Sequence, residues 1–128
     1  METRKPKILV VEDDNALRQV LTDRLNEEGF EVLAAEDGEK GLSLAQLHHP
    51  ALILLDIFMP RMDGLTMLGK LRQSDEWGNS VFVMVVTNSA DATTIATIAG
   101  FGATEFLIKS DWGLEDIIAR IKTHLKKL

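Results

Sequence analysis

The chain alternates between strand-like and helix-like stretches five times, and this alternation most constrains its fold. Short apolar runs between turn residues predict buried strands, and apolar residues recurring every three or four positions predict helices. Regular alternation implies parallel strands, right-handed crossovers and helices on both faces of the sheet. Expected strands span about residues 8–11, 30–35, 51–55, 81–86 and 105–108, and expected helices about 15–28, 37–49, 65–74, 90–99 and 114–128. The pattern predicts an α/β fold, a flavodoxin-like (βα)5 three-layer sandwich.

The sheet order that suits five such units is 2-1-3-4-5, although periodicity alone does not fix it. The expected strand at 30–35 is short and more polar than the others, which favours an edge position. Residues 75–80 are polar and are expected to form a loop. A length of 128 residues without a linker or repeat predicts one domain over residues 1–128, with no output domain after it.

Composition narrows the possible partners and locations. The net charge of −6 and a pI near 5.0 argue against nucleic acid or an anionic membrane as a direct partner. The sequence contains no cysteine, which excludes disulfides, thiolate catalysis and cysteine-based zinc sites. Its apolar runs are all far shorter than the roughly 20 residues of a membrane span. A soluble, cytoplasmic protein is therefore expected.

Acidic residues follow two of the expected strands. Asp13 and Asp14 come just after the run that ends at Val11, and Asp56 directly follows Leu55. The carboxyl ends of parallel strands open into one crevice, so these carboxylates are expected to gather there. At 4 Å, two carboxylates repel by about 4 kcal/mol at an effective dielectric of 20. A divalent cation such as Mg²⁺ relieves this repulsion, because its preferred ligands are oxygen atoms.

Two further strands end in polar residues that complete this crevice. Thr87 and Lys109 follow apolar runs and would bring a hydroxyl and an ammonium group beside the carboxylates. The set suits phosphoryl transfer, in which a carboxylate such as Asp56 can act as nucleophile and fixed charges neutralise the phosphoryl oxygens. Each residue also has an ordinary structural explanation: Asp13 and Asp14 could cap a helix, and Thr87 and Lys109 could simply end strands.

Four segments together resemble the response-regulator receiver domain of two-component signalling, in its single-domain, chemotaxis-regulator-like form. They are Val10–Asp14, Leu55–Gly64, Val86–Thr87 and Phe106–Lys109, and they follow one another at the family's spacing. The resemblance implies that Asp56 is the phosphoacceptor and a metal ligand. It further implies roles for six residues: Asp13 and Asp14 hold Mg²⁺, one of them through water, the backbone carbonyl of Phe58 is a further ligand, Thr87 is the switch hydroxyl, Lys109 binds the phosphoryl group, and Phe106 is the aromatic switch.

The same resemblance implies what the protein would do. Asp56 would accept a phosphoryl group from a phosphohistidine of a sensor histidine kinase or a phosphotransfer protein, in a reaction that requires Mg²⁺. Beyond this self-phosphorylation and autodephosphorylation it would not be a turnover enzyme. The modified form would bind a downstream protein effector, or a second copy of itself, through the helix at 90–99, the strand at 105–108 and the terminal helix.

Three positions depart from the family pattern. Asn88 stands where a small residue is usual after the switch threonine, and Ser110 stands where a proline usually forms a cis bond after the lysine. Phe58, two residues after Asp56, is apolar and offers the acyl phosphate cover rather than a hydrogen bond. A trans or strained cis bond is expected before Ser110, because cis bonds before other residues cost about 2.5–4 kcal/mol. These departures keep open a phosphorylation-independent, receiver-like adaptor.

Two alternatives from other classes share the expected fold. An FMN-binding flavodoxin-type module would need a phosphate-binding loop after the first strand, where Glu12, Asp13 and Asp14 would repel a phosphate. A phosphatase with an aspartyl nucleophile typically carries a second aspartate two residues after the first, and Phe58 occupies that position. Both are disfavoured by the residues present.

Overall fold

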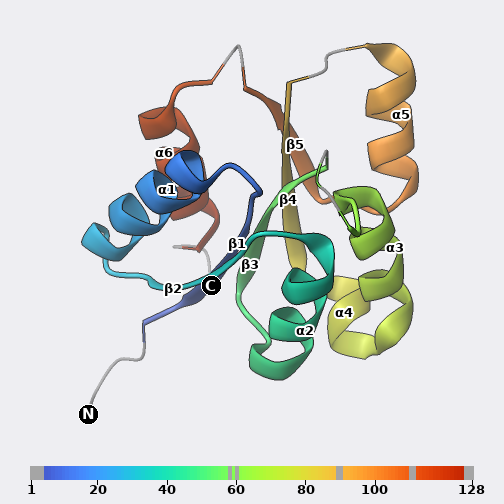
Figure 1. Ribbon diagram of the computed structural model, residues 1–128, viewed down its shortest axis with the longest axis horizontal. Helices are drawn as coiled ribbons and strands as arrows, with labels where there is room; N and C mark the ends of the chain where they lie inside the picture. Colours follow the sequence, from blue (N-terminus) through green and yellow to red (C-terminus); the bar gives the residue numbers. More distant parts are fainter. Residues whose placement is uncertain (1–4, 58, 60, 89–90, 110–111, 126–128) are drawn as a thin grey trace.

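Five parallel strands form one sheet in the order β2-β1-β3-β4-β5 (Figure 1). The structure is a computed structural model that describes residues 5–57, 59, 61–88, 91–109 and 112–125. The predicted α/β class, strand order and edge position of the second strand are confirmed. The strands are β1 (Lys7–Val11), β2 (Glu31–Ala35), β3 (Leu52–Asp56), β4 (Phe82–Thr87) and β5 (Glu105–Ile108).

Helices cover both faces of the sheet and make the predicted three layers (Figure 1). The helices are α1 (Asn15–Glu27), α2 (Gly38–His48), α3 (Gly64–Ser74), α4 (Glu76–Ser80), α5 (Ala92–Gly100) and α6 (Leu114–Leu125). Helices α1 and α6 pack on one face, whereas α2, α3, α4 and α5 lie on the other. The expected helix at 90–99 is thus α5, and the expected terminal helix is α6. No helix in the described part of the chain has the length and apolar character needed to span a membrane.

The central strands divide their side chains between the two cores. In β1, Ile8 and Val10 pack with the α1 and α6 side, whereas Leu9 and Val11 pack with the α2, α3 and α5 side. All four are at most 1 % exposed. Side chains of a strand alternate between faces, so a strand covered on both sides needs a continuous apolar run. This requirement explains why the strands could be predicted from such runs.

The segment at 75–80 differs from its predicted loop. Residues Glu76–Ser80 form the short helix α4, and the Asp75 carboxylate caps it by accepting a hydrogen bond from the Gly78 N–H at 2.6 Å. The indole of Trp77 stacks on the His49 ring with centroids 4.2 Å apart. The loop prediction was wrong because a helix of one turn shows no apolar periodicity, and its capping residue was the available signal.

Aspartates begin most of the helices. Such a residue stabilises a helix because its carboxylate accepts a hydrogen bond from a backbone N–H of the first turn, which lacks a partner within the helix. The longer helices capped in this way are α1, α2, α3 and α5, with Asp14, Asp37, Asp63 and Asp91 accepting from the N–H groups of Leu17, Lys40, Thr66 and Thr94. Part of the acidic composition therefore serves the fold rather than the crevice.

Candidate functional site

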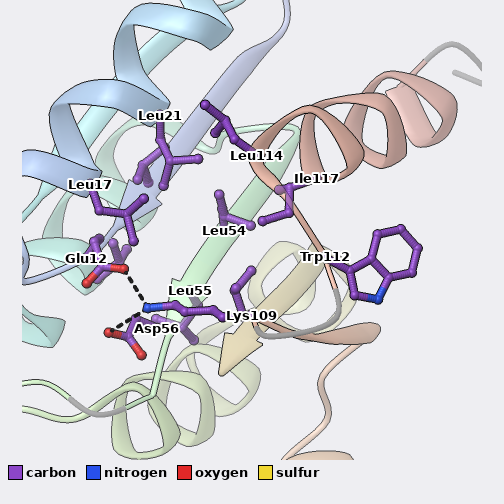
Figure 2. A pocket seen from close by; sticks show the side chains of 13 residues that line it. Glu12, Leu17, Leu21, Leu54, Leu55, Asp56, Lys109, Trp112, Leu114 and Ile117 are labelled. Atoms are coloured by element: carbon purple, nitrogen blue, oxygen red, sulfur yellow. Dashed lines mark hydrogen bonds and ion pairs between the residues drawn. The ribbon is translucent and has the colours of Figure 1, made fainter. Parts of the chain in front are cut away.

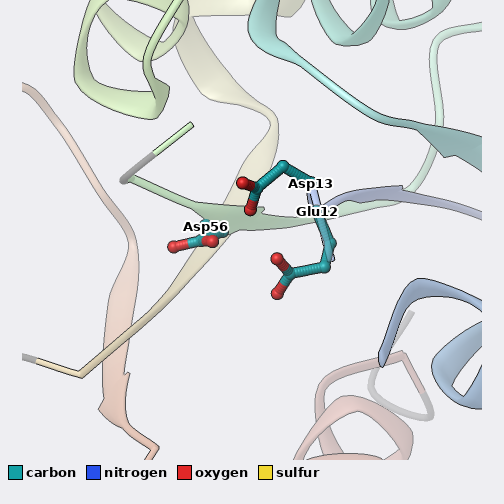
Figure 3. A group of neighbouring side chains, drawn as sticks. All are labelled: Glu12, Asp13 and Asp56. Carbon is teal, nitrogen blue, oxygen red and sulfur yellow. The ribbon is translucent and has the colours of Figure 1, made fainter. Parts of the chain in front are cut away.

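Three carboxylates meet at the carboxyl edge of the sheet (Figure 3). Glu12 and Asp13 follow β1 directly, and Asp56 is the last residue of the neighbouring β3. One carboxylate oxygen from each lies within 4.8 Å of the others. Glu12 and Asp56 are 4 % and 8 % exposed, whereas Asp13 is open to solvent. The cluster concentrates negative charge on two buried groups and one exposed group, with side-chain oxygens of the kind that Mg²⁺ binds.

Glu12 belongs to the cluster although it was not among the predicted site residues. Its backbone N–H donates to the Ala35 carbonyl at 3.0 Å, which continues the pairing of β1 and β2 by one residue. Its carboxylate accepts from the Asp14 N–H at 3.2 Å, and its carbonyl accepts from the Arg18 guanidinium at 2.8 Å. These two hydrogen bonds hold Glu12 in place at the end of β1. Its position directly after an apolar run was the sequence signal that could have identified it.

Asp14 lies differently from the other predicted metal ligands. Its carboxylate accepts a hydrogen bond from the Leu17 N–H at 2.9 Å and so caps α1. Among the described residues, the acidic cluster contains Asp13 and Asp56 but not Asp14. The structure therefore brings together two of the three carboxylates predicted to hold a metal and adds Glu12. A metal-binding role for Asp14 stays a prediction.

Lys109 brings a positive charge to the cluster. Its ammonium lies 3.1 Å from the Glu12 carboxylate and 3.9 Å from that of Asp56 (Figure 2). Its backbone N–H donates to the carbonyl of Thr87 at 2.7 Å, which fixes the start of the loop after β5 against the end of β4. Three carboxylates and one ammonium leave a formal charge of −2, so Lys109 offsets only part of the repulsion.

The two predicted switch residues lie on neighbouring strands. Thr87 ends β4 and is fully buried, and Phe106 in β5 is partly buried. Phe106 pairs in register with Val85, two residues before Thr87. Side chains two positions apart share a face, so Thr87 and Phe106 both point to the side covered by α5. The structure thus places the two side chains on one face of neighbouring strands, and their switch roles stay predictions.

Three predicted features fall on residues that are not described. Phe58, with its expected carbonyl ligand and its expected cover of the acyl phosphate, lies outside the described residues, as does Ser110. The isomer of the Lys109–Ser110 bond is therefore outside them too. Asn88 is described and is exposed directly after β4.

An ion pair and a hydrogen bond hold Arg61 and Met62, which follow β3, against the start of α2. The Arg61 guanidinium lies 2.7 Å from the Asp37 carboxylate, and the Gly38 N–H donates to the Met62 carbonyl at 2.9 Å. Arg61 adopts a φ of 64°, a conformation that side chains with a Cβ rarely take. The hydrogen bond from the Lys40 N–H, followed by that from Arg61, holds the pKa of Asp37 below its ordinary value. Arg61 and Met62 are thereby attached to the start of α2.

Gly64 packs directly against the backbone of Asp56, which makes its substitution informative. A Cβ at this position would lie 2.3 Å from the Asp56 carbonyl oxygen and 2.6 Å from the Ile57 Cα. Backbone atoms cannot move aside as a flexible side chain would. We expect Gly64→Ala to lower the free energy of unfolding by about 1–3 kcal/mol, the usual range for overpacking.

The measurement for Gly64 is chemical denaturation, with Gly100→Ala as the control. A Cβ on Gly100 would meet nothing within 4 Å, and this glycine belongs to α5. A Gly64→Ala protein as stable as the wild type would show that Gly64 does not restrain the end of β3.

Comparison with known proteins identifies relatives of the chain. A family model described as "Response regulator receiver domain" matches residues 8–122. A protein of Cyanophora paradoxa named "Probable transcriptional regulator ycf27" is 35% identical over 127 residues, covering 99% of this chain and 51% of the relative. "Response regulator MprA" of Mycolicibacterium vanbaalenii is 35% identical over 123 residues, covering 94% and 51%. The chain spans about half the length of these relatives.

Solved structures show the same fold. The chemotaxis protein CheY4 of Vibrio cholerae superposes with a TM-score of 0.86 at 25% identity, covering 94% of this chain and 98% of the other. A CheY-like receiver domain protein of Methanospirillum hungatei gives a TM-score of 0.86 at 27% identity, covering 97% and 96%. Both likenesses extend over nearly the whole of each chain.

Proposed function

The chain belongs to the response regulator receiver domain family, and on that premise we propose that Asp56 accepts a phosphoryl group from a phosphohistidine. The donor would be a sensor histidine kinase or a phosphotransfer protein. The observation that carries the proposal is the position of the Asp56 carboxylate, which is nearly buried at the end of β3 and gathered with Glu12 and Asp13. The Lys109 ammonium stands 3.9 Å away. A nucleophilic carboxylate beside a fixed cation is the arrangement that phosphoryl transfer uses.

The proposed reaction moves one phosphoryl group between two protein side chains. A bond forms between an Asp56 carboxylate oxygen and phosphorus while the bond from the histidine nitrogen to phosphorus breaks, and the product is an acyl phosphate. Lys109 would contact a phosphoryl oxygen as a point charge, and the Thr87 hydroxyl would donate a hydrogen bond to another. The chain would not act as a turnover enzyme beyond gaining and losing this group.

The acidic cluster fits a Mg²⁺ ion by its chemistry, because its three side chains present oxygen atoms and carry charge that needs neutralising. When bound, Mg²⁺ would neutralise charge on the phosphoryl oxygens. We propose that Asp13 and Asp56 hold it, with Glu12 in the position assigned to Asp14 on sequence grounds, since the Asp14 carboxylate caps α1. The predicted carbonyl ligand at Phe58 remains part of the proposal.

We further propose that the output surface comprises α5, β5 and α6. Helix α5 carries no charged residue, and Phe106 on β5 shares the face of Thr87. On phosphorylation Thr87 would shift, and Phe106 would transmit this shift to the output surface. The changed surface would favour binding of a protein effector or of a second copy of the chain. That residues 1–128 act as a single receiver domain in the cytoplasm, without direct contact to nucleic acid or membrane, stays a prediction.

Labelling with acetyl phosphate and Mg²⁺ tests the proposed function. Intact-mass spectrometry should show one added phosphoryl group on the wild type and none on Asp56→Ala. Asp75→Asn is the matched control, because it removes an aspartate that caps α4 at the other end of the sheet. Label that persists in Asp56→Ala would place the nucleophile elsewhere. A wild type that takes no label would favour the phosphorylation-independent adaptor, in keeping with Asn88 and Ser110.

Thermal unfolding tests the proposed metal site separately from phosphorylation. Mg²⁺ should stabilise the wild type, by about 2.7 kcal/mol at one hundred times the dissociation constant, and should do much less for Asp56→Asn. Without Mg²⁺, Asp56→Asn should be the more stable protein, because one of three repelling charges is gone. If Mg²⁺ did not change the melting temperature of the wild type, the metal assignment would be contradicted, even if acetyl phosphate still labelled the protein.

A further inference from the structure

An apolar cavity of about 170 Å³ lies behind the acidic cluster, between the sheet, α1 and α6 (Figure 2). Ten of its thirteen lining residues are apolar; they are Val10, Val11, Leu17, Leu21, Leu54, Leu55, Val86, Trp112, Leu114 and Ile117, of which Val11 and Leu55 turn their side chains to the other face of the sheet. The other three are Glu12, Asp56 and Lys109, which gather at one end. Three of the apolar lining residues are only partly buried: Leu17, Trp112 and Leu114. The cavity is therefore not fully closed off from solvent.

The size and lining of this cavity select a class of ligand. Protein interiors leave few voids larger than a water molecule, and an apolar cavity of about 150 Å³ in another protein stays dry and binds benzene. The walls here offer water little hydrogen bonding away from the charged end. A molecule with one aromatic ring therefore matches both the volume and the apolar lining.

The charged end of the cavity limits the charge of a ligand and the hydrogen bonds that it can make there. Two carboxylates and one ammonium give it a formal charge of −1, and the ammonium already lies within 3.9 Å of both carboxylates. Without Mg²⁺ an anionic ligand would be repelled, whereas a hydroxyl could donate to a carboxylate, which has about four acceptor positions. The Glu12 carboxylate receives one bond from Lys109 and one from the Asp14 N–H, which leaves acceptor positions over.

We propose that this cavity binds a small, neutral, single-ring aromatic molecule whose hydroxyl group donates to the carboxylate of Glu12. Phenol is the simplest molecule of this class. The site shares Glu12, Asp56 and Lys109 with the candidate phosphorylation site, but its apolar part is separate from it. Ligand binding does not depend on phosphoryl transfer, so the two proposals can fail independently.

Tryptophan fluorescence gives a direct readout of binding. The sequence holds two tryptophans, and Trp112 lines the cavity whereas Trp77 lies in α4 beside His49. In a Trp77→Phe protein, titration with phenol should change the Trp112 emission along a saturable curve. Benzoate has a similar ring but a negative charge, and it should bind at least about tenfold more weakly. Saturable binding of benzoate as tight as that of phenol would overturn the charge argument.

Filling the cavity should weaken phenol binding. Leu114→Phe places a larger side chain in the lining, so phenol binding should weaken about tenfold or more through overpacking. Leu47→Phe is the matched control, because Leu47 on α2 is 76 % exposed and should leave binding unchanged. Thermal unfolding in phenol is a second readout that needs no tryptophan: the midpoint should rise for the wild type and for Leu47→Phe, but not for Leu114→Phe. No saturable response in either readout, or an equal response in all three proteins, would overturn the proposal.

Discussion

Replacing Lys109 by alanine should slow the labelling of Asp56 by acetyl phosphate about a hundredfold or more. The Lys109 ammonium is fixed between the carboxylates of Glu12 and Asp56, at 3.1 and 3.9 Å, where a phosphoryl group on Asp56 would bring new negative charge. Removing one such fixed donor from an active site typically costs about 10²–10³ in rate. The initial rate of label incorporation, followed by intact-mass spectrometry at fixed Mg²⁺, measures the effect.

The control for Lys109 is Lys70→Ala, which removes an exposed lysine from α3. It should label at the rate of the wild type. Mg²⁺ should still raise the melting temperature of Lys109→Ala, because the three carboxylates of the cluster remain. Unchanged labelling of Lys109→Ala would assign phosphoryl binding to another group, whereas loss of both labelling and Mg²⁺ stabilisation would indicate a collapsed site.

The same substitution should also change stability in the absence of metal. Lys109→Ala leaves Glu12 and Asp56 nearly buried with their mutual repulsion uncompensated. Because the lysine side chain is 23 % exposed, we expect a loss of about 2 kcal/mol, below the roughly 3–5 kcal/mol for breaking a fully buried pair. Adding Glu12→Gln should recover most of this loss. A double variant no more stable than Lys109→Ala would show that charge repulsion is not the cause.

The sheet could be predicted from the sequence because burial on both faces leaves a simple signature. A run such as Leu52–Leu55 must be apolar at every position when helices cover both sides, and that run is visible without any tertiary information. The strand order was predicted as the one that suits five such units, although periodicity alone did not fix it, and the structure confirms it.

The assignment of individual acids could not be predicted in the same way. Glu12, Asp13 and Asp14 are consecutive, and which of them caps α1 depends on where that helix starts relative to the end of β1. That start also depends on how α1 packs on the sheet, through residues such as Leu21 and Leu25, and this packing is not visible in the three acids. The sequence therefore located the acidic edge correctly but did not select Glu12 for the cluster.

Arg72 is a further residue whose role depends on tertiary structure. It lies in α3, and its guanidinium donates to the carbonyls of Gly78 at 2.9 Å, Val81 at 2.7 Å and Gly102 at 2.8 and 3.0 Å. These carbonyls belong to α4, the residue before β4 and the turn before β5. Partial burial lowers the pKa of Arg72 below its ordinary value, but an arginine remains charged at neutral pH. One side chain thus joins three segments at the end of the sheet opposite Asp56.

Arg72→Met should therefore be the most destabilising of the changes considered for the fold. Methionine keeps an unbranched apolar stem but donates no hydrogen bond, so three carbonyls lose a charged donor, and each costs about 1–3 kcal/mol where water cannot replace it. Allowing for water at the more exposed Gly102, we expect a loss of about 3–5 kcal/mol, or about 10–20 °C in melting temperature. Arg120→Met is the control, because that side chain is 43 % exposed and pairs with Glu105, so its loss should cost at most about 1 kcal/mol. Below its melting temperature Arg72→Met should still label at Asp56, because its contacts lie at the other end of β4 and β5. A melting temperature that falls no further than that of Arg120→Met would show that water satisfies these carbonyls equally well.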